Sequence, residues 1–529
     1  MSNPREQPQP TMWAESELPP RAAEARESAA APQAPPRFQA VNRQQMMWRA
    51  VEVERLVEPE HLVRAIWEMT GRLDLTPYTA AVRAVEGRAG RTPYDPRLLI
   101  SLWIYAYSEK VSSAREVERR CGYHPAYQWL TGCEIINHHT LSDFRVDYQE
   151  ALDKLFAQLL AILSSEGLIT LEQVVHDGTK VKAAASGKSF HREKTLRAHL
   201  EAAQQRVQAM GDPRDEAATR GSERARERAA REKVERLTQA LEELKKVQAA
   251  PEGRAEPSER RASATDAEAR NMKQGDGGYA PSHNVQISTD TAHSIIVGAS
   301  VTQEASDQKQ LVPAVEEVEK QNGRAPDQMI VDDGYTTREN ILAADDRRLD
   351  LIGSTMEKDT EAVRKGLEKR GLDPAFYPEN FRYDPQTNAY TCPQGQKLSH
   401  RATRRRRAGV EHQVYQARAA DCRSCALRAA CKPGKQGRQI VRSENVPAVA
   451  DYVAKMQTEA ARAAYRRRAP VAEFSNLWLK AKLGLRQFCV RGLKKARCEV
   501  LWACLTYNIQ QWFRLRWKVR RQALAAGGI

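Results

Sequence analysis

Three acidic residues stand where regular structure would present them for chemistry. Asp177 lies inside the β-branched run Val-Val-His-Asp-Gly-Thr-Lys, and Asp332 follows the apolar run Met-Ile-Val. Glu473 lies in a helical segment next to Phe474. Two strand carboxylates and one helix carboxylate supply hard oxygen ligands, which can hold two Mg²⁺ ions about 4 Å apart during phosphoryl transfer. We therefore predict metal-dependent chemistry at phosphorus.

Each of these residues also has an ordinary interpretation when it is taken alone. Asp177 could be a turn or edge-strand aspartate, and Glu473 could be a solvated helix residue. Either Asp332 or Asp333 could cap the helix that follows. An unpaired charge inside an apolar strand is costly, however, so Asp177 needs partners or a cleft. The chain has no G-x-S-x-G, no P-loop and no G-x-G-x-x-G after a strand, so it offers no rival nucleophile.

The chain around the carboxylates predicts a mixed α/β sheet. After Gly167 the apolar residues alternate and are often β-branched, which is typical of strands. The expected order is β-β-β-α-β-α-β, with strands over 173–183, 283–290, 293–302, 328–333 and 350–354 and helices over 307–320 and 338–344. Asp332 would then lie at the carboxyl end of a strand, where α/β sheets commonly hold ligands.

Helices are expected before and after this sheet. Residues 38–170 predict an all-α unit of roughly six helices, with a long one from about 141 to 163. This unit could bind DNA or be a plain helical bundle, and both interpretations stay open. Residues 446–522 also predict helices. Pro470 should break or kink the first of them, so that Glu473 lies in the first turn after the break.

Two insertions divide the sheet, whose residues are expected in 171–187 and 276–355. Residues 188–275 are rich in Ala, Arg and Glu, and two apolar seams at about 3.5-residue spacing predict an antiparallel helical hairpin. This hairpin could be a solvated excursion or a binding arm. Residues 356–445 form a second insertion with turn residues, cysteines and arginines.

The second insertion contains four cysteines. The pair Cys422-x2-Cys425 has the spacing of a structural zinc site, Cys431 follows it, and Cys392 precedes it by 29 intervening residues. We predict a structural Zn²⁺ site, because four thiolates close the coordination shell, and four ordinary cysteines are the alternative. The other cysteines are expected in the core, and they are Cys121, Cys133, Cys489, Cys498 and Cys504.

The charge balance indicates a polyanionic partner. The formal net charge is +15 and the pI is about 9.4. Arg404, Arg405 and Arg406 belong to a run of five arginines within residues 401–407. Between residues 486 and 521, ten Lys or Arg residues stand against one acid, and tryptophans that can stack on unpaired bases are interleaved with them. These tryptophans are Trp502, Trp512 and Trp517.

The composition excludes several other classes of protein. The chain has no apolar run of about 18 residues, as a membrane helix requires. The first residues lack the apolar segment of a secretory signal, and the odd, scattered cysteines argue for a reducing cytoplasm. The Pro/Ala-rich stretch 1–37 predicts a disordered tail, and 523–529 predicts a short tail. We expect a cytoplasmic, nucleoid-associated protein.

At its acidic residues the sequence resembles bacterial insertion-sequence DDE transposases, whose catalytic core has a ribonuclease-H-like fold. The strand Val-Val-His-Asp-Gly-Thr-Lys matches the first motif, and Met-Ile-Val-Asp-Asp-Gly-Tyr matches the family's Asp-x-Gly-Tyr segment. The helical part has Tyr465-x2-Arg468-x4-Glu473-x6-Lys480, where the usual family form has three residues between Arg and Glu. The resemblance covers roughly residues 40–520. It is supported by the order and spacing of these segments, which agree with those of the family.

The resemblance implies roles for particular residues. Asp177, Asp332 and Glu473 would be the catalytic metal ligands, and the family motif selects Asp332 rather than Asp333. Two Mg²⁺ ions are implied, for which Mn²⁺ can substitute. The implied or expected DNA contacts are Tyr465, Arg468, Lys480, Arg491, Lys494, Arg404, Arg405 and Arg406. Lys480 could instead be a solvated lysine.

The function predicted from the sequence is cut-and-paste DNA transposition. The protein would bind the terminal inverted repeats of its own element, cleave the strand and join the freed end to target DNA. Pairing two element ends implies a homodimer or a larger synaptic complex on double-stranded DNA. The alternatives are a metal-dependent nuclease of the same fold and a non-catalytic DNA-binding protein derived from a transposase.

Overall fold

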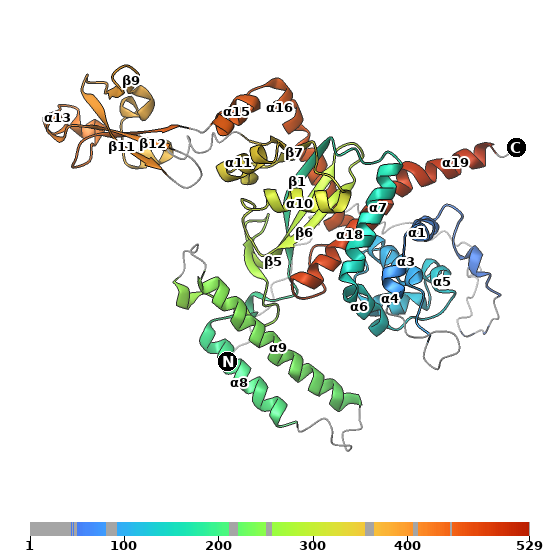
Figure 1. Cartoon of the computed structure of the whole chain (residues 1–529). Coiled ribbons are helices and arrows are strands. Elements are labelled where there is room, and N and C mark those ends of the chain that lie inside the picture. Colours follow the sequence, from blue (N-terminus) through green and yellow to red (C-terminus); the bar gives the residue numbers. More distant parts are fainter. Residues whose placement is uncertain are drawn as a thin grey trace, which may run out of the picture. The chain divides into compact units, whose positions relative to one another are not determined.

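The computed structural model describes residues 44, 46, 50–80, 92–210, 221–249, 256–354, 364–405, 411–444 and 447–527. The chain divides into a unit from Met1 to Val51 and a unit from Glu52 to Ile529. The helices and strands of the described ranges lie in the second unit (Figure 1). The predicted tail over 1–37 lies outside the described residues. Among the described residues, every helix is too short or too polar to span a lipid bilayer.

A six-stranded mixed sheet confirms the predicted α/β core. Its strands lie in the order β4-β5-β1-β7-β8, and β6 pairs with β5. They are β1 (Gln173–Lys182), β4 (Arg270–Lys273), β5 (Tyr279–Asp290), β6 (Ile296–Thr302), β7 (Gln328–Val331) and β8 (Asp350–Ile352). Strands β4, β5, β6 and β1 pair antiparallel, whereas β1, β7 and β8 pair parallel. Strand β4 was not predicted, because Arg-Asn-Met-Lys contains no β-branched residue.

Helices cover both faces of this sheet. Consecutive residues of β5 point to opposite faces, and Ser288 pairs across the strands with Gly298 of β6. A Cβ atom at Gly298 would lie 3.0 Å from Val318 Cγ2 of α10 (Leu311–Asn322). On the other face, Thr289 Oγ1 donates to Ser475 Oγ of α17 (Arg468–Leu477) at 3.2 Å. Helix α17, which carries Glu473, therefore packs on the face opposite α10.

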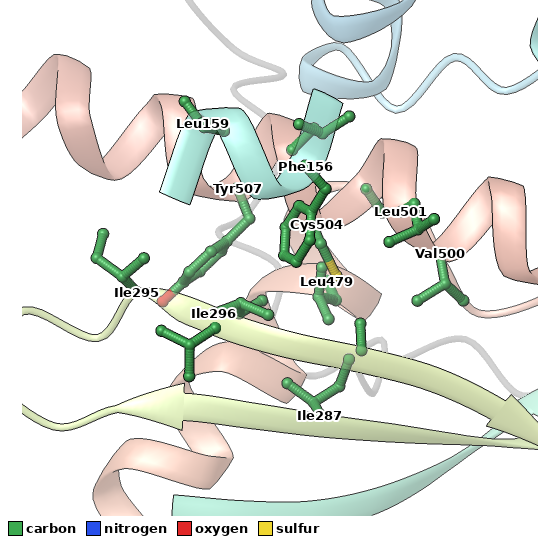
Figure 2. Packing of buried hydrophobic residues seen from close by; sticks show 14 of the residues in the cluster. Phe156, Leu159, Ile287, Ile295, Ile296, Leu479, Val500, Leu501, Cys504 and Tyr507 are labelled. Atoms are coloured by element: carbon green, nitrogen blue, oxygen red, sulfur yellow. The ribbon is translucent and has the colours of Figure 1, made fainter. Parts of the chain in front are cut away.

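Helix α18 (Leu493–Trp512) is a central buried helix, in which all residues from 500 to 509 are buried. It packs against β6, α3 (Pro96–Ser108) and α7 (Gln149–Ser165). Asn508 completes the edge of β6, since its Oδ1 accepts from Ile296 N at 2.9 Å and its Nδ2 donates to Ile296 O at 2.8 Å. Figure 2 shows Cys504 and Tyr507 of α18 in the apolar cluster that also contains Phe156 and Ile296.

Helices precede the sheet, as predicted. In the described residues they are α1 (Leu62–Thr70), α2 (Thr76–Thr79), α3, α4 (Ala114–Cys121), α5 (Pro125–Thr131), α6 (His138–Asp147) and α7. Two helix starts follow common sequence signals. Pro96 is the first residue of α3, and Ser113 Oγ accepts from Glu116 N at the start of α4.

The single long helix predicted over 141–163 is wrong. The chain leaves helical geometry at Tyr148, between α6 and α7, where φ is −103° and ψ is 46°. The break packs the Tyr148 ring against Tyr78 and Phe144, with ring centroids 5.2 and 5.3 Å apart. The contact with Tyr78 comes from a residue distant in sequence, so apolar periodicity could not reveal it.

The first insertion forms the predicted helical pair. Helices α8 (Glu193–Gln208) and α9 (Gly221–Ala249) run side by side (Figure 1), and the short strands β2 (Phe190–His191) and β3 (Ala262–Ser263) pair next to them in the sequence. Buried apolar residues between the helices include Leu196, Ala203, Leu237 and Leu244. Glu243 of α9 pairs with Arg270 of β4, which joins the hairpin to the central sheet.

The second insertion contains an antiparallel sheet that the sequence did not reveal. Its order is β13-β12-β11-β10-β9. The strands are β9 (Arg382–Asp384), β10 (Ala389–Thr391), β11 (Lys397–Arg405), β12 (Glu411–Ala417) and β13 (Gln439–Glu444), with helices α13 (Ala419–Arg423) and α14 (Arg428–Cys431) before β13. The core includes Phe381, Leu398, Tyr415 and Ile440. Arginines and turn residues interrupt the alternation of apolar and polar residues in this segment, so the sequence did not predict these strands.

Between the second insertion and α18, the chain is helical with several breaks. Helices α15 (Pro447–Met456), α16 (Glu459–Arg466) and α17 are followed by a π-helical turn at Trp478–Lys482. Pro470 is the third residue of α17, where no backbone N–H group has a partner within the helix, so its missing N–H group removes no hydrogen bond. The break in the helix therefore lies before Arg468, the first residue of α17. Glu473 therefore lies in the second turn of α17, not in the first turn as predicted. After a second π-helical turn at Phe513–Trp517, α19 (Lys518–Gly527) extends past residue 522.

Candidate active site

The parallel register of β1 and β7 brings Asp177 and Asp332 next to each other. His176 pairs with Val331, which is the last residue of β7. Asp177 and Asp332 directly follow His176 and Val331, so they occupy neighbouring positions at the end of β7. The two predicted strand carboxylates therefore come from adjacent strands of the central sheet.

The guanidinium group of Arg468 lies between these carboxylates. Its Nη1 atom is 3.9 Å from Asp177 Oδ2, and its Nη2 atom is 3.5 Å from Asp332 Oδ1. The Arg468 guanidinium carbon is also 5.9 Å from the centroid of the Tyr465 ring. Arg468 and Tyr465, which were predicted to contact DNA, thus lie at the two aspartates.

The carboxyl group of Asp177 is in an environment that disfavours its charge. Burial raises the pKa of Asp177 to about 6, and the nearby carboxylates of Asp332 and Asp307 act in the same direction. Arg468 and a hydrogen bond from Gly178 N at 2.9 Å lower this pKa. A site with several carboxylates in close range favours the binding of additional positive charge.

Glu473 and Lys480 lie on the helical side of the site. Glu473 is exposed, and among the described residues it makes no hydrogen bond or ion pair. Asn476, three residues along the same side of α17, donates from Nδ2 to Asp177 Oδ2 at 3.4 Å. Lys480 is partly buried, and burial lowers its pKa whereas Asp177 raises it. Lys480 is therefore within the electrostatic range of Asp177.

A buried polar layer lies on the other face of β1. The His176 ring contacts Ser288 Oγ at 2.9 Å and Gln286 Oε1 at 2.8 Å. Tyr335 donates its hydroxyl to the same Gln286 oxygen at 2.6 Å. Because Tyr335 ends the 3₁₀ turn that begins after Asp332, this bond ties the turn to β5.

Asp307 belongs to this polar layer, and sequence reasoning missed it. It was expected to begin a helix, but α10 begins four residues later, at Leu311. Its Oδ1 accepts from Asn284 at 2.7 Å, from Gln286 at 2.8 Å and from Lys180 at 3.3 Å. A Cβ atom at Gly178 would lie only 2.6 Å from the same oxygen. A glycine inside a strand often marks such a close approach, and Gly178 was the available signal.

The donor groups fit a hard divalent cation, although the described residues contain no preformed group of three His, Cys, Asp or Glu side chains able to hold a metal. Asp177 and Asp332 present carboxylate oxygens from neighbouring strands. The Asn476 Oδ1 atom is buried without a hydrogen-bond partner, on the side chain whose nitrogen contacts Asp177. An unsatisfied oxygen at this place suits a cation or a water molecule that a cation carries.

The other predicted DNA contacts lie outside this cluster. Arg491 and Lys494 are exposed at the start of α18. Arg404 is exposed on β11, and Arg405 is the last residue of that strand. Arg406 lies outside the described residues.

The three tryptophans that were expected to stack on bases are core residues, so that expectation is wrong. Each of them is only 1% exposed. Their ring nitrogens donate within the protein, Trp502 to Arg145 O, Trp512 to Glu166 and Trp517 to Glu68. Their basic sequence neighbours were misleading, because α18 is buried along most of its length and the nearby charges lie at its ends.

The four cysteines of the second insertion line one cavity of about 30 Å³. Cys392, which follows β10, lies there with Cys422, Cys425 and Cys431. Backbone N–H groups of Gln396 and Arg438 donate to Cys392 Sγ and Cys422 Sγ, each at 3.3 Å. The fold thus brings the distant Cys392 to the cysteine cluster.

The remaining cysteines fulfil the core prediction only in part. Cys121, Cys498 and Cys504 are buried, whereas Cys133 and Cys489 are exposed. Cys133 follows the glycine that ends α5 and has a φ of 68°, which places it in a surface turn. Cys489 lies in the loop before α18, where its sulfur contacts Ser112 Oγ at 2.9 Å. None of the nine cysteines forms a disulfide.

Two family models match the chain. A transposase DDE domain matches residues 391–513, and a transposase domain (DUF772) matches residues 51–147. The first match includes Arg468, Glu473 and Lys480, whereas Asp177 and Asp332 lie outside both matched ranges. No curated protein matches the chain. These two matched ranges, which together make up less than half of the chain, indicate a member of the insertion-sequence DDE transposase family.

Proposed function

We propose that this transposase binds the terminal inverted repeats of its own insertion sequence and moves the element by cut-and-paste DNA transposition. The observation that carries the proposal is the parallel register that sets Asp177 beside Asp332, with Arg468 between them. Adjacent carboxylates at the end of a strand are the arrangement that phosphoryl transfer with divalent metals requires. The ribonuclease-H-like core is part of the same proposal, and the mixed sheet with helices is consistent with it.

Asp177, Asp332 and Glu473 are the proposed ligands of two Mg²⁺ ions, which Mn²⁺ can replace. The ions would supply positive charge to the attacking and leaving oxygens of the phosphodiester. Asp177 and Asp332 are held by adjacent strands, so their spacing is set by the sheet. Glu473 would complete the ligand set from α17, which Asn476 already links to Asp177.

The remaining residues of the site would position the DNA. Arg468 would exchange its carboxylate partners for a phosphate group, whose oxygens suit the guanidinium fork. Tyr465 would pack beside Arg468, and Lys480 would contact a neighbouring phosphate. Water would hydrolyse the strand at the element end, and the freed 3′-hydroxyl would then attack target DNA in line. Catalysis would come mainly from positioning and from neutralisation of charge at the phosphorus.

The partners follow from this reaction. Two element ends must be held together with the target, which implies a homodimer or a larger synaptic complex on double-stranded DNA. Arg491, Lys494 and the arginines Arg404, Arg405 and Arg406 are proposed as further phosphate contacts. The protein would act in the cytoplasm, in association with the nucleoid.

Strand joining tests this function directly. The protein would be incubated with Mg²⁺, a duplex that carries the genomic flank of its reading frame, and a supercoiled target plasmid. The proposal expects strand cleavage at the element boundary, followed by covalent joining to the plasmid. Cleaved ends that never join would favour the nuclease alternative, and DNA binding without cleavage would favour the non-catalytic alternative.

A structural Zn²⁺ site at Cys392, Cys422, Cys425 and Cys431 is a separate proposal, supported by their shared cavity. Metal analysis of the purified protein should find about one zinc per chain, as expected for a four-thiolate site. Cys425→Ser should lose this metal, whereas Cys133→Ser, which changes an exposed cysteine outside the cluster, should keep it. Zinc at trace level in the unsubstituted protein would remove the proposal.

A further inference from the structure

A segment distant in sequence extends the central sheet beside the active-site strand. Lys182, the last residue of β1, pairs in parallel with Gln487. The Lys182 N–H donates to Arg486 O at 3.1 Å, and Phe488 N donates to Lys182 O at 2.8 Å. Residues 486–488 therefore lie on the side of β1 where β7 also pairs.

This pairing leaves an open stretch of β1 between two fixed points. Strand β7 pairs with β1 only up to His176, and within the described residues no strand pairs with residues 178–181 on that side. Asp177 lies at one end of this stretch, and Lys182 lies at the other. The five residue-to-residue steps from Asp177 to Lys182, at about 3.3 Å each, span roughly 17 Å, which corresponds to about five nucleotides of one DNA strand.

Cations lie on both faces of this stretch, since Lys182 shares the face of Lys180, whereas Lys480 follows α17 on the face of Asp177. Lys182 and Arg486 are exposed, and Lys480 is partly buried. The Nε atom of Arg486 donates to Lys480 O at 3.3 Å, which holds the guanidinium over the π-helical turn. Among the described residues, none of these three cations forms an ion pair. Lys180, in contrast, is paired with Asp307 at 3.3 Å.

The position of Lys480 is electrostatically unfavourable without an anion. Burial lowers the pKa of Lys480, and both Arg486 and Lys180 lower it further by repulsion, while Asp177 raises it. A phosphodiester chain that supplies one negative charge per nucleotide would offset this repulsion. The guanidinium of Arg486 is suited to bind such a group, because one nitrogen is already held by the backbone and the fork is planar.

We propose that Lys182, Lys480 and Arg486 form a phosphate-binding edge that holds one DNA strand along β1, starting at Asp177. Lys480 was already expected to contact DNA, whereas Lys182 and Arg486 are new. This inference rests on the proposed function, since it assigns the path of the DNA that the active site would cut. The edge binds backbone phosphates and carries no sequence preference of its own.

The salt dependence of DNA binding tests the phosphate-binding edge. The affinity of the full chain for a fluorescein-labelled duplex of about 30 base pairs and random sequence would be measured by fluorescence anisotropy at KCl concentrations from about 0.05 to about 0.3 M. The slope of log K against log[KCl] then reports the number of phosphates that the protein neutralises. Lys182→Gln and Arg486→Gln should each reduce the steepness of log K against log[KCl] by about one. Each should also weaken DNA binding about eightfold at about 0.1 M salt. Arg486→Lys keeps the charge and should keep most of the slope.

Lys320→Gln is the matched control, because it removes one positive charge from an exposed lysine on α10 that faces Asp153. It should leave the slope unchanged. If the unsubstituted protein binds the duplex with a steep slope but Lys182→Gln and Arg486→Gln behave like Lys320→Gln, the phosphate-binding edge is wrong. If the unsubstituted protein does not bind the duplex, the proposed DNA function fails instead. Thermal unfolding of each variant verifies that the fold is retained.

Discussion

At the scale of single residues, the site depends on how closely β1 approaches the polar layer beneath it. Gly178 follows Asp177 in β1 and packs directly on the buried, hydrogen-bonded side chains of Asp307, Gln286 and Tyr335. A Cβ atom at Gly178 would lie 2.6 Å from Asp307 Oδ1, 2.7 Å from Gln286 Nε2 and 2.9 Å from Tyr335 Oη. These atoms are held by hydrogen bonds to one another, so they have little freedom to move away.

We predict that Gly178→Ala destabilises the protein by about 1–3 kcal/mol, because an extra methyl group forces this layer apart. Chemical denaturation measures the change. Gly187→Ala is the control, since a Cβ atom there has no neighbour within 4 Å, and it should change stability by less than about 0.5 kcal/mol. Equal stability of both variants would show that the layer adapts to the methyl group.

Residue patterns were informative at Asp177 and Asp332, because an acid inside or directly after an apolar strand needs a special explanation. For Asp307 they offered only the indirect signal of Gly178, and they gave no signal for Asn476, which reaches the site on α17. Trp502 and Trp512 of α18 and Trp517 of the π-helical turn after it were misread for a physical reason. Their charged sequence neighbours suggested a surface, but α18 is buried along most of its length and each indole N–H finds an internal acceptor.

At the scale of elements, α18 does more than fill the core, because it also completes the sheet. Strand β6 pairs with β5 on one side, and Asn508 supplies both a donor and an acceptor to Ile296 on the other. Two backbone groups of a buried strand thus depend on one side chain. Element boundaries within the helices were harder to foresee, because the break at Tyr148 depends on packing against Tyr78, and Pro470 indicated the break before Arg468 only to within one turn.

We predict that Asn508→Leu destabilises the protein by about 2–4 kcal/mol, because it leaves the Ile296 N–H and C=O groups buried and unpaired. Urea unfolding followed by circular dichroism measures this loss. Asn271→Leu provides the comparison, since Asn271 is exposed on β4, and it should be nearly neutral. A neutral Asn508→Leu would mean that the strand edge finds other partners.

At the scale of the whole molecule, one hydrophobic cluster joins the helices before the sheet to the last helices of the chain. It contains buried residues from Val57 to Trp517 and includes the inner faces of the sheet and of α18. The sequence predicted helices, mixed sheet and helical hairpin in the right order. It could not predict that distant segments share this cluster, nor that the cysteine-containing insertion forms its own sheet.

The shared cluster predicts strong dependence on the C-terminal helices. A chain ending at residue 492 would lack α18 and should fail to form a cooperative fold, because the surfaces of α3, α7 and β6 that α18 covers would be exposed. A chain ending at residue 517 loses only α19 and keeps Trp517, so it should still unfold cooperatively. Solubility and thermal unfolding distinguish the two truncations, and a stable chain ending at 492 would contradict this description of the core.

The central claim is that adjacent carboxylates of β1 and β7 carry out strand cleavage. The most direct measurement compares cleavage of the element-end duplex in Mg²⁺ by the unsubstituted protein, Asp332→Asn and Asp333→Asn. The expected result is that Asp332→Asn loses cleavage by at least about a hundredfold while it still binds DNA, since it removes one charge from the metal site. Asp333→Asn, one residue further, should retain cleavage. Full cleavage by Asp332→Asn would contradict the account.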